Sequence, residues 1–413
     1  MLKITTSERA RCQQEPGRTL PGVVGAEATV APWWCGLRAM VTRSMMIIAT
    51  VTGVAAGSVE AAERRTAAGP VLITEMATGL NTPWGIGFLP DGHYLVTERD
   101  GQLLHFAPGP GGQRTAVAGV PNVFDRGQGG LLDVAVARDF AESRQIFLTY
   151  SKPYRRGRRA GTALAVATLS ADGSRLDDVR VLFEMLSPSS GSRHFGSRVA
   201  EAEDGSLYLT IGDRGGRDKA QNLALHHGKI IRIHRDGSVP EDNPFIGRSG
   251  ARPEIWSWGH RNPQGLAFDS DGNLWAVEHG PMGGDEINRI GKGLNYGWPV
   301  IGYGRHYSGA QVGIGHAREG LEQPEFYWDP SIAPCGMMIY SGRLWPEWRG
   351  QIFVASLKFD LISRLDPEGG VSEEERLSFP ETLRVRDVRE APDGSIWFLS
   401  EGNGAVYRMA PKR

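Results

Sequence analysis

Short apolar segments that alternate with polar positions run through most of the chain, and turn residues separate them. In the clearest example, Leu266 and Phe268 precede the Ser-Asp-Gly-Asn turn at 270–273, and Leu274 and Ala276 follow it. A period of two predicts β-strands, and two such strands about an Asp-Gly step predict a β-hairpin. No long helical period competes with this pattern. The sequence therefore predicts an all-β fold.

The strand–turn–strand unit recurs along the chain. Six copies lie at residues 84–96, 132–148, 199–209, 266–276, 337–354 and 388–398. Repeats of about 40–50 residues with four strands each are typical of a β-propeller, and inserted loops account for longer spacings. We therefore predict a six-bladed β-propeller that forms the catalytic domain over residues 70–410. A pair of β-sandwiches is the alternative, but it does not explain six similar units.

The N-terminal end carries a different pattern. Residues 40–61 combine Arg43, an apolar run at 45–56 and a small-x-small step at 59–61. A basic start, a short apolar run and small residues at the end predict a secretory signal peptide, which is too short to span a membrane. Residues 1–39 show no periodicity, and we interpret them as a non-native or disordered extension. The mature chain is therefore expected to be periplasmic and without a membrane span.

Composition narrows the class of function. A formal net charge of -1 over 413 residues provides no basic field for nucleic acid, and 55 glycines with 25 prolines favour a turn-rich β fold. Of the three cysteines, Cys12 and Cys35 precede the predicted cleavage site, so Cys335 has no partner for an internal disulfide. We expect Cys335 to be a packed thiol, because its neighbours carry no nucleophile signature.

Polar clusters recur just before the outer hairpin of successive repeats. Equivalent strand starts of a propeller converge on one end of its axis. The residues expected to meet there are Gln128, His194, Arg261, Asn262, Lys358, Arg384 and Arg386. Four cations around one point repel one another unless an anion lies among them, and arginine forks match planar carboxylates. The sequence predicts a site for a small polyanion, with a salt-bridged outer face as the alternative for the arginines at 384 and 386.

An oxygen-rich segment follows the fourth hairpin. Gly280-Pro281 presents main-chain carbonyl groups in a restrained conformation, because proline fixes one φ angle. Asp285 and Glu286 add carboxylates nearby, and oxygen ligands suit a hard cation such as calcium. A solvated acidic pair is the alternative. His279 has no second histidine at a useful spacing, so we expect it to pack rather than to bind metal.

Eight motifs occur in order along residues 75–410: GQGGLLDV, RHFGSR, LTIGDRG, HRNPQGLAF, EHGPMGGDEIN, KGLNYGWP, ASLK and RVRDV. Together they resemble the soluble PQQ-dependent aldose sugar dehydrogenases and, more distantly, the soluble quinoprotein glucose dehydrogenases and sorbosone dehydrogenases. The match covers nearly all of the predicted propeller, and the ordered set is specific where any single motif is weak. PQQ is a planar tricarboxylate ortho-quinone, which suits the cationic site.

The resemblance implies roles for individual residues. The implied PQQ ligands are Gln128, Arg261, Asn262, Tyr307, Lys358, Arg384 and Arg386. The implied calcium ligands are Gly280, Pro281, Glu286 and, through its main chain, Tyr296. His194 matches the general base, which would take the C1 hydroxyl proton of an aldose while hydride passes to PQQ and a lactone forms. The sequence has no Cys-x-x-Cys-His haem motif, so an external electron acceptor is expected. The protein would be a monomer or a homodimer.

The sequence departs from the family pattern beside His194. The glucose enzymes carry an acid just before the base, whereas Arg193 stands here, which leaves Asp213 as a candidate for orienting the ring. The basic run at 152–161 is interpreted as a solvated loop, with an anionic partner as the alternative. Two other functions stay open. One is a calcium-dependent lactonase or esterase, which needs no convergent cations, and the other is a non-catalytic binding propeller.

Overall fold

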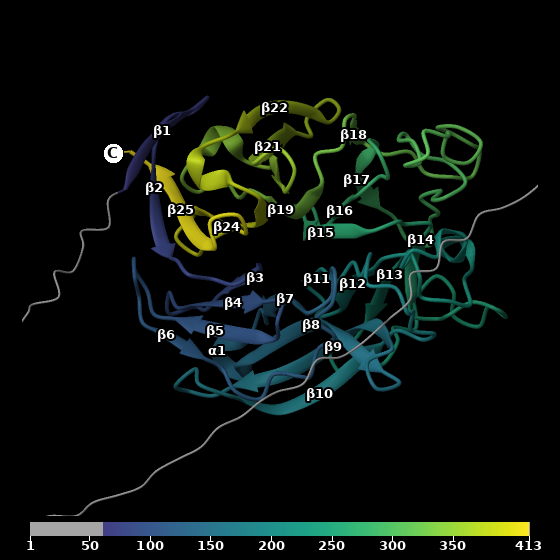
Figure 1. The fold of residues 1–413 in the computed structure, drawn as a ribbon, viewed down its shortest axis with the longest axis horizontal. Helices are drawn as coiled ribbons and strands as arrows, with labels where there is room; N and C mark the ends of the chain where they lie inside the picture. The colour runs from purple at the N-terminus through teal and green to yellow at the C-terminus, as the bar shows by residue number, and fades with distance from the viewer. Residues whose placement is uncertain (1–60, 413) are drawn as a thin grey trace, which may run out of the picture. The chain divides into compact units, whose positions relative to one another are not determined.

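The computed structural model describes residues 61–412, and six antiparallel sheets are arranged around a central axis (Figure 1). The predicted six-bladed β-propeller is confirmed, and each hairpin identified in the sequence forms the first two strands of one blade. The predicted signal peptide and the extension before it lie outside the described residues. Among residues 61–412, no helix is long and apolar enough to cross a membrane.

The elements follow chain order from blade to blade. Blade 1 is β3 (Pro83–Phe88), β4 (Tyr94–Glu98), β5 (Gln102–Phe106) and β6 (Arg114–Ala116), and blade 2 is β7 (Leu131–Val136), β8 (Gln145–Tyr154), β9 (Arg159–Leu169) and β10 (Leu176–Glu184). Blade 3 is β11 (Val199–Glu201), β12 (Leu207–Ile211), β13 (Lys229–Ile233) and β14 (Ile255–Trp258), and blade 4 is β15 (Pro263–Phe268), β16 (Leu274–Glu278), β17 (Asp285–Ile290) and β18 (Phe326–Trp328). Blade 5 is β19 (Pro334–Ile339), β20 (Ile352–Ser356), β21 (Leu361–Asp366) and β22 (Ser372–Leu377). The short helices are α1 (Phe140–Ser143), η1 (Arg217–Gln221), η2 (Pro346–Trp348) and η3 (Pro380–Thr382).

The sixth blade closes the ring by joining both ends of the propeller. It contains β23 (Val385–Glu390), β24 (Ile396–Ser400) and β25 (Ala405–Pro411), followed in space by β2 (Gly69–Ala77) and β1 (Ala62–Thr66). β2 pairs with β25 in antiparallel register, with Val71 opposite Pro411 and Ile73 opposite Met409. The main-chain groups of the C-terminal strand are thus paired by the N-terminal segment, so β25 is an inner strand and β1 forms the outer edge of this sheet.

Asp-Gly turns join the two strands in four of the six hairpins. The glycines at 92, 205, 272 and 394 have φ angles of 87°, 78°, 79° and 86°, a region that favours glycine. In three of these turns the aspartate side chain also accepts the N–H of the residue two positions on: His93 to Asp91 at 3.1 Å, Ser206 to Asp204 at 2.8 Å and Ser395 to Asp393 at 2.9 Å.

A buried ionic cluster fills the axis between the two ends of the first strands. Arg198 contacts Asp133 at 2.8 Å and Asp387 at 3.2 Å, and Arg389 contacts both carboxylates at 3.2 Å. The guanidinium of Arg198 also lies over the Trp84 ring, 4.3 Å from its centroid. Two arginines balance two aspartates, so the cluster is neutral as a whole. It divides the axial channel into one cavity at each end of the propeller.

Candidate active site

The cavity at the starting ends of the first strands has a volume of about 290 Å³, which is at the lower end for a small-molecule site. Its lining comes from five blades and includes Trp84, Arg99, Gln128, Leu132, Phe195, Gly196, Asn262, Gln264, His279, Leu357, Arg384, Arg386 and Glu401. Because the strand starts converge here as expected, residues far apart in the sequence share one basin.

A repeated bulge aims side chains into this cavity. The register between first and second strands slips at the second residue of β3, β7, β15 and β23. The residues at these slips, Trp84, Leu132, Gln264 and Arg386, all line the cavity. A β-bulge turns one side chain away from the regular alternation, and bulges are frequent beside functional sites. The same backbone device thus places one residue from each of four blades at the axis.

His194 lies next to the cavity, between Arg193 and the lining residue Phe195, in the segment that joins β10 to β11. Its Nδ1 is 2.7 Å from Oδ1 of Asp213, and its main-chain N–H donates to Oε1 of Gln128 at 2.6 Å. The carboxylate as acceptor assigns the proton to Nδ1, so Nε2 carries the free lone pair. The ring is therefore oriented as a base through Nε2.

Asp213 is held by its own partners. The N–H of Gly215 donates to Oδ1 at 2.7 Å, and the indole N–H of Trp298 donates to Oδ2 at 2.9 Å. Burial raises the pKa of Asp213, but its hydrogen bond with His194 and these two donors bring the pKa below its ordinary value. Asp213 thus stays an ionised acceptor for the imidazole. It supplies the orienting acid that the position before His194 lacks.

The electrostatic environment keeps His194 neutral. Burial is the largest influence and lowers its pKa, and the charges of Arg261 and Arg193 act in the same direction. The hydrogen bond to Asp213 opposes them, and the pKa remains below its ordinary value. A lowered pKa means that the ring is unprotonated at neutral pH, which a general base requires.

The predicted cations do not all reach the cavity. Arg384 and Arg386 line it, and both are paired with Glu401, which contacts Arg384 at 3.3 Å and Arg386 at 2.6 Å. They therefore form salt bridges, but at the axis rather than on an outer face. Arg261 lines an adjoining pocket, and its guanidinium donates to the His279 carbonyl at 3.1 Å. Lys358 is exposed, with its ammonium 4.8 Å from the centroid of the Phe359 ring.

The remaining predicted PQQ ligands differ in position. Asn262 lines the cavity, and its side-chain oxygen accepts the N–H of Gly196 at 3.2 Å. Gln128 lines it as well, while bonded to the His194 main chain. Tyr307 is 74% exposed and is absent from the lining of the cavity.

Sequence analysis gave no role to Glu278, which fixes the start of β15. Its carboxylate accepts the main-chain N–H of Arg261 at 2.6 Å and of Asn262 at 3.3 Å. It also contacts Nδ1 of His260 at 2.9 Å. A glutamate at the end of a buried strand was the only available signal. Glu401, the residue directly after β24, was also missed.

The four predicted calcium ligands surround the adjoining pocket. Gly280, Pro281, Glu286 and Tyr296 line it together, and no main-chain N–H within residues 61–412 donates to the carbonyl groups of Gly280, Pro281 or Tyr296. Glu286 is half-buried in the lining of this pocket, and no Lys or Arg of the described chain pairs with it. Burial, followed by the charge of Glu278, raises the pKa of Glu286 to about 8. These oxygen donors fit a hard cation.

Asp285 has a different task from its neighbour. Its carboxylate accepts the N–H groups of Gly280 at 2.8 Å and Ala333 at 3.0 Å, and the hydroxyl of Ser331 at 2.7 Å. Asp285 thus secures the loop that carries the carbonyl groups. Within the described part of the chain, no three His, Cys, Asp or Glu side chains are grouped as metal ligands, so a cation here would depend on main-chain oxygens.

Of the two residues that the sequence assigned to packing, His279 is half-buried and Cys335 is buried. His279 lines both pockets, and burial lowers its pKa to about 3, so the ring is neutral. Cys335 is 1% exposed, and burial raises the pKa of its thiol to about 11, which leaves no reactive thiolate at neutral pH. Its sulfur instead accepts a hydrogen bond from Arg386 at 3.2 Å.

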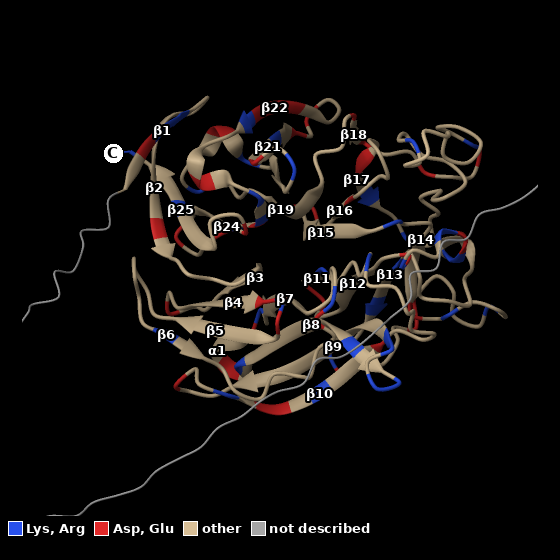
Figure 2. Cartoon of the chain, viewed as in Figure 1, with Lys and Arg blue, Asp and Glu red and all other residues tan. Residues whose placement is uncertain are grey.

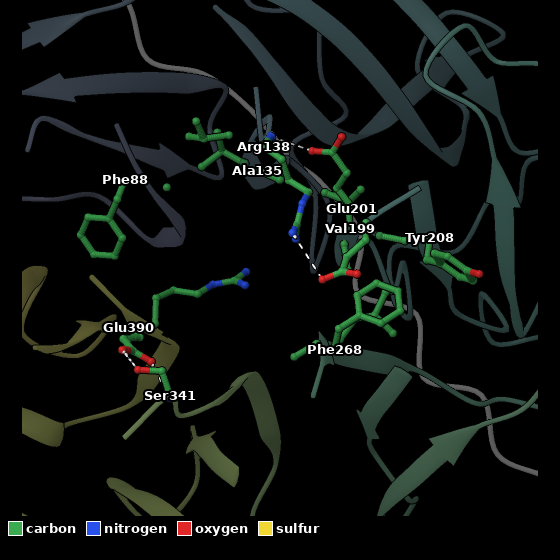
Figure 3. Close-up of a pocket in the computed structure, with 18 of the residues that line it drawn as sticks. Phe88, Ala135, Arg138, Val199, Glu201, Tyr208, Phe268, Ser341 and Glu390 are labelled. Atoms are coloured by element: carbon green, nitrogen blue, oxygen red, sulfur yellow. Dashed lines mark hydrogen bonds and ion pairs between the residues drawn. The ribbon is translucent and has the colours of Figure 1, made fainter. Parts of the chain in front are cut away.

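The cavity at the opposite end of the axis is larger, about 880 Å³, and has different chemistry (Figure 3). It is lined by the finishing ends of the first strands, with Phe88, Phe268 and Tyr208 among its apolar residues. Its acids Glu201 and Glu390 are engaged with Arg235 and Ser341. None of the predicted site residues lines it, so the chemistry is concentrated at the His194 end.

The comparisons define the class of protein. The family model described as Glucose / Sorbosone dehydrogenase matches residues 80–408, and the chain belongs to this family of propeller oxidoreductases. Among its relatives is the aldose sugar dehydrogenase YliI of Escherichia coli, 43% identical over 339 residues, which cover 81% of this chain and 91% of the relative.

Solved structures agree. The apo form of the soluble aldose sugar dehydrogenase of Escherichia coli has a TM-score of 0.80 at 41% identity and covers 83% of this chain and 100% of its own. The PQQ-bound form of the aldose sugar dehydrogenase of Streptomyces coelicolor has a TM-score of 0.68 at 27% identity and covers 84% of this chain and 99% of its own.

Proposed function

We propose that the protein is a PQQ- and calcium-dependent dehydrogenase that oxidises aldose sugars at C1 to lactones. The observation that carries this proposal is the oriented His194–Asp213 pair beside a cavity that Arg384 and Arg386 line, with Arg261 adjoining it. A dehydrogenase that uses a polyanionic cofactor needs both features, whereas a hydrolase needs only the first. The family match favours neither the calcium-dependent hydrolase nor the binding propeller.

Residues from several blades would hold the cofactor. Arg261, Arg384 and Arg386 would meet the carboxylates of PQQ, while Gln128 and Asn262 would donate amide hydrogen bonds. Tyr307 and Lys358 would complete the set at the exposed rim. Glu401 now neutralises part of this charge, so the arginines would share their hydrogen bonds between Glu401 and the cofactor.

The chain's own part in the reaction is proton transfer. Nε2 of His194 would accept the proton of the C1 hydroxyl, and Asp213 would stabilise the imidazolium that forms. Bound PQQ would supply the acceptor for the hydride that leaves C1. Arg261 is placed to stabilise negative charge beside the base. Gly280, Pro281, Glu286 and the main chain of Tyr296 would hold calcium next to this region.

The proposal also covers the substrate, the electron acceptor and the cellular location. The substrate would be an aldose, and the electrons would pass to an external acceptor. Export to the periplasm is proposed from the pattern at residues 40–61 alone.

Reconstitution tests the proposed function. We expect the purified protein to reduce a redox dye only when PQQ, calcium and an aldose are all present. Omission of PQQ should leave no dye reduction, because no other group in the site accepts a hydride. Dye reduction that never depends on PQQ would overturn the proposal. Calcium-dependent hydrolysis of a lactone or ester without PQQ would favour the hydrolase instead.

Removing the charge of Asp213 should slow turnover and move its pH dependence. We expect Asp213→Asn to lower kcat by about 10²–10⁴-fold, the range for a misoriented general base. Asp213 raises the pKa of His194, while Arg261 and Arg193 lower it and His279 stays neutral beside it. Loss of Asp213 therefore lowers that pKa further, and the acidic limb of the pH–rate profile should move to lower pH.

The matched control is Asp218→Asn, which removes an equal charge from an exposed aspartate of η1. A profile for Asp213→Asn that keeps its acidic limb in place would show that Asp213 has only a structural role.

A further inference from the structure

The tip of the β8–β9 hairpin gathers an unusual density of positive charge. Four arginines occupy five consecutive positions, Arg155, Arg156, Arg158 and Arg159, and all four are exposed. None of them forms an ion pair with an acid within residues 61–412, although Lys152 on the same hairpin is paired with Glu184. Figure 2 shows this basic tip projecting from blade 2. The formal net charge of the whole chain is -1, so the tip is a local departure.

The basic tip lies at the His194 end of the propeller. The main chain of Ala160 exchanges two hydrogen bonds with Ser189, at 2.9 and 3.1 Å, and Arg159 donates to the Pro188 carbonyl at 3.4 Å. The four arginines and Ser190 line a hollow of about 510 Å³. Ser190 precedes His194 by four residues, so their Cα atoms are at most ~15 Å apart.

The backbone at the tip is costly as well as charged. Arg155 and Arg156 have φ angles of 48° and 56°, where a non-glycine residue is strained by about 1–3 kcal/mol. Like charges at adjacent positions add repulsion, and nearby acids do not relieve it. Gly or Asn adopts a positive φ angle at a hairpin turn with less strain, so stable folding does not require arginine at these two positions. The choice of arginine therefore points to a role outside folding.

The exposure of the tip indicates what kind of partner fits it. No arginine of the tip is buried, and its hollow is open, so it lacks the enclosure that a small anion needs for specific binding. An exposed patch of one sign attracts a broad surface of the opposite sign and raises its association rate by about 10–10³-fold. Arg193, exposed beside His194, continues the same charge toward the site.

We propose that the β8–β9 tip, together with Arg193, docks an acidic one-electron carrier protein that reoxidises the enzyme. The inference rests on the proposed function. Conversion of one aldose to its lactone releases two electrons and two protons. The two electrons leave singly, to two oxidised carrier molecules docked in turn, and the two protons go to solvent. Docking near His194 brings the acceptor close to the site where the electrons become available.

Acceptor charge tests the proposal. The reconstituted enzyme would be assayed with cytochrome c whose lysines are succinylated, with unmodified basic cytochrome c, and with neutral 1,4-benzoquinone. The test variant carries Arg→Ser at 155, 156, 158 and 159. The matched control carries the same change at four exposed arginines of the opposite end, Arg138, Arg175, Arg248 and Arg343.

We expect the test variant to lose about 10-fold or more of kcat/KM for succinylated cytochrome c at low ionic strength, with the loss shrinking in high salt. Rates with benzoquinone, and all rates of the control variant, should equal those of the wild type.

An unchanged rate with succinylated cytochrome c, or a wild-type preference for the basic protein, would overturn docking. A higher KM for the sugar with no change toward the acceptor would assign the tip to substrate binding and also overturn it. Wild-type enzyme that reduces none of the three acceptors would instead contradict the proposed dehydrogenase.

Discussion

His194→Ala should abolish most turnover while PQQ still binds. A positioned general base contributes about 10²–10⁴-fold to a rate, so we expect kcat to fall within that range. His194 is absent from the lining of the cavity that holds Arg384 and Arg386, and its loss leaves those cations in place. The measurement is dye reduction at saturating aldose, together with titration of PQQ into the variant.

A control separates the lost base from a general defect. His234→Ala removes an exposed histidine at the far end of blade 3 and should leave kcat unchanged. If His194→Ala retained more than about a tenth of the wild-type kcat, another group would have to take the C1 proton. If it lost PQQ binding as well, His194 would belong to the cofactor site rather than to proton transfer.

Arg198→Ala should give the largest loss of stability. Arg198 is 1% exposed and lies between Asp133 and Asp387, which are fully buried. Its removal leaves two aspartates with only Arg389 between them, and breaking a buried ion pair from one side costs about 3–5 kcal/mol. Urea-induced unfolding measures the change. Arg180→Ala on exposed β10 is the matched control and should change the free energy of unfolding by less than ~0.5 kcal/mol.

The loss in free energy of unfolding caused by Arg198→Ala should depend on pH, and the direction of this dependence can be derived. Burial raises the pKa of Asp133 in the folded protein, while Arg198 is the first of the charges that lower it. Without Arg198 the folded-state pKa rises further above that of the unfolded chain. A carboxyl group whose pKa is higher in the folded than in the unfolded protein lowers the free energy of unfolding as pH rises between these two pKa values. The group lowers it least at a pH where it is protonated in both states. The deficit of Arg198→Ala should therefore narrow as the pH is lowered. A deficit below 1 kcal/mol at neutral pH would contradict this account.

The alternation of apolar and polar residues around turns was sufficient to predict the blades, but not how the ring of blades closes. Each hairpin has alternating strands around a short turn, four of the six turns contain an Asp-Gly step, and every predicted hairpin is present. The strands β1 and β2 carry no such turn. β1 pairs with β2, and β2 pairs with β25 at the other end of the chain. A contact between Val71 and Pro411 depends on the whole ring having formed, so no nearby residues encode it.

The site was predictable in outline because the strand starts of a propeller converge. The charged residues on the axis of the propeller were not predictable. Arg198, Asp133 and Asp387 stand in motifs that look solvent-facing, yet they fill the axis, because two glycines leave room for the carboxylates. A Cβ on Gly336 would lie 1.9 Å from Asp387, and a Cβ on Gly85 would lie 3.0 Å from Asp133.

The bulges show where strict strand alternation does not determine the face that a side chain occupies. Strict alternation sets the face of each side chain, and a slip of one residue changes it. Arg386 and Trp84 face the cavity because of such slips. The pairing of Arg384 and Arg386 with Glu401 was equally hidden, since Glu401 lies on a neighbouring strand end.

The central claim is that cationic side chains from separate blades hold a polyanionic redox cofactor at one end of the axis. Titration of PQQ into the protein with calcium, followed by its absorption spectrum, tests this claim most directly. The account predicts saturation at one PQQ per chain and a further spectral change when an aldose is added. A PQQ spectrum that stays that of the free compound at every protein concentration would contradict it.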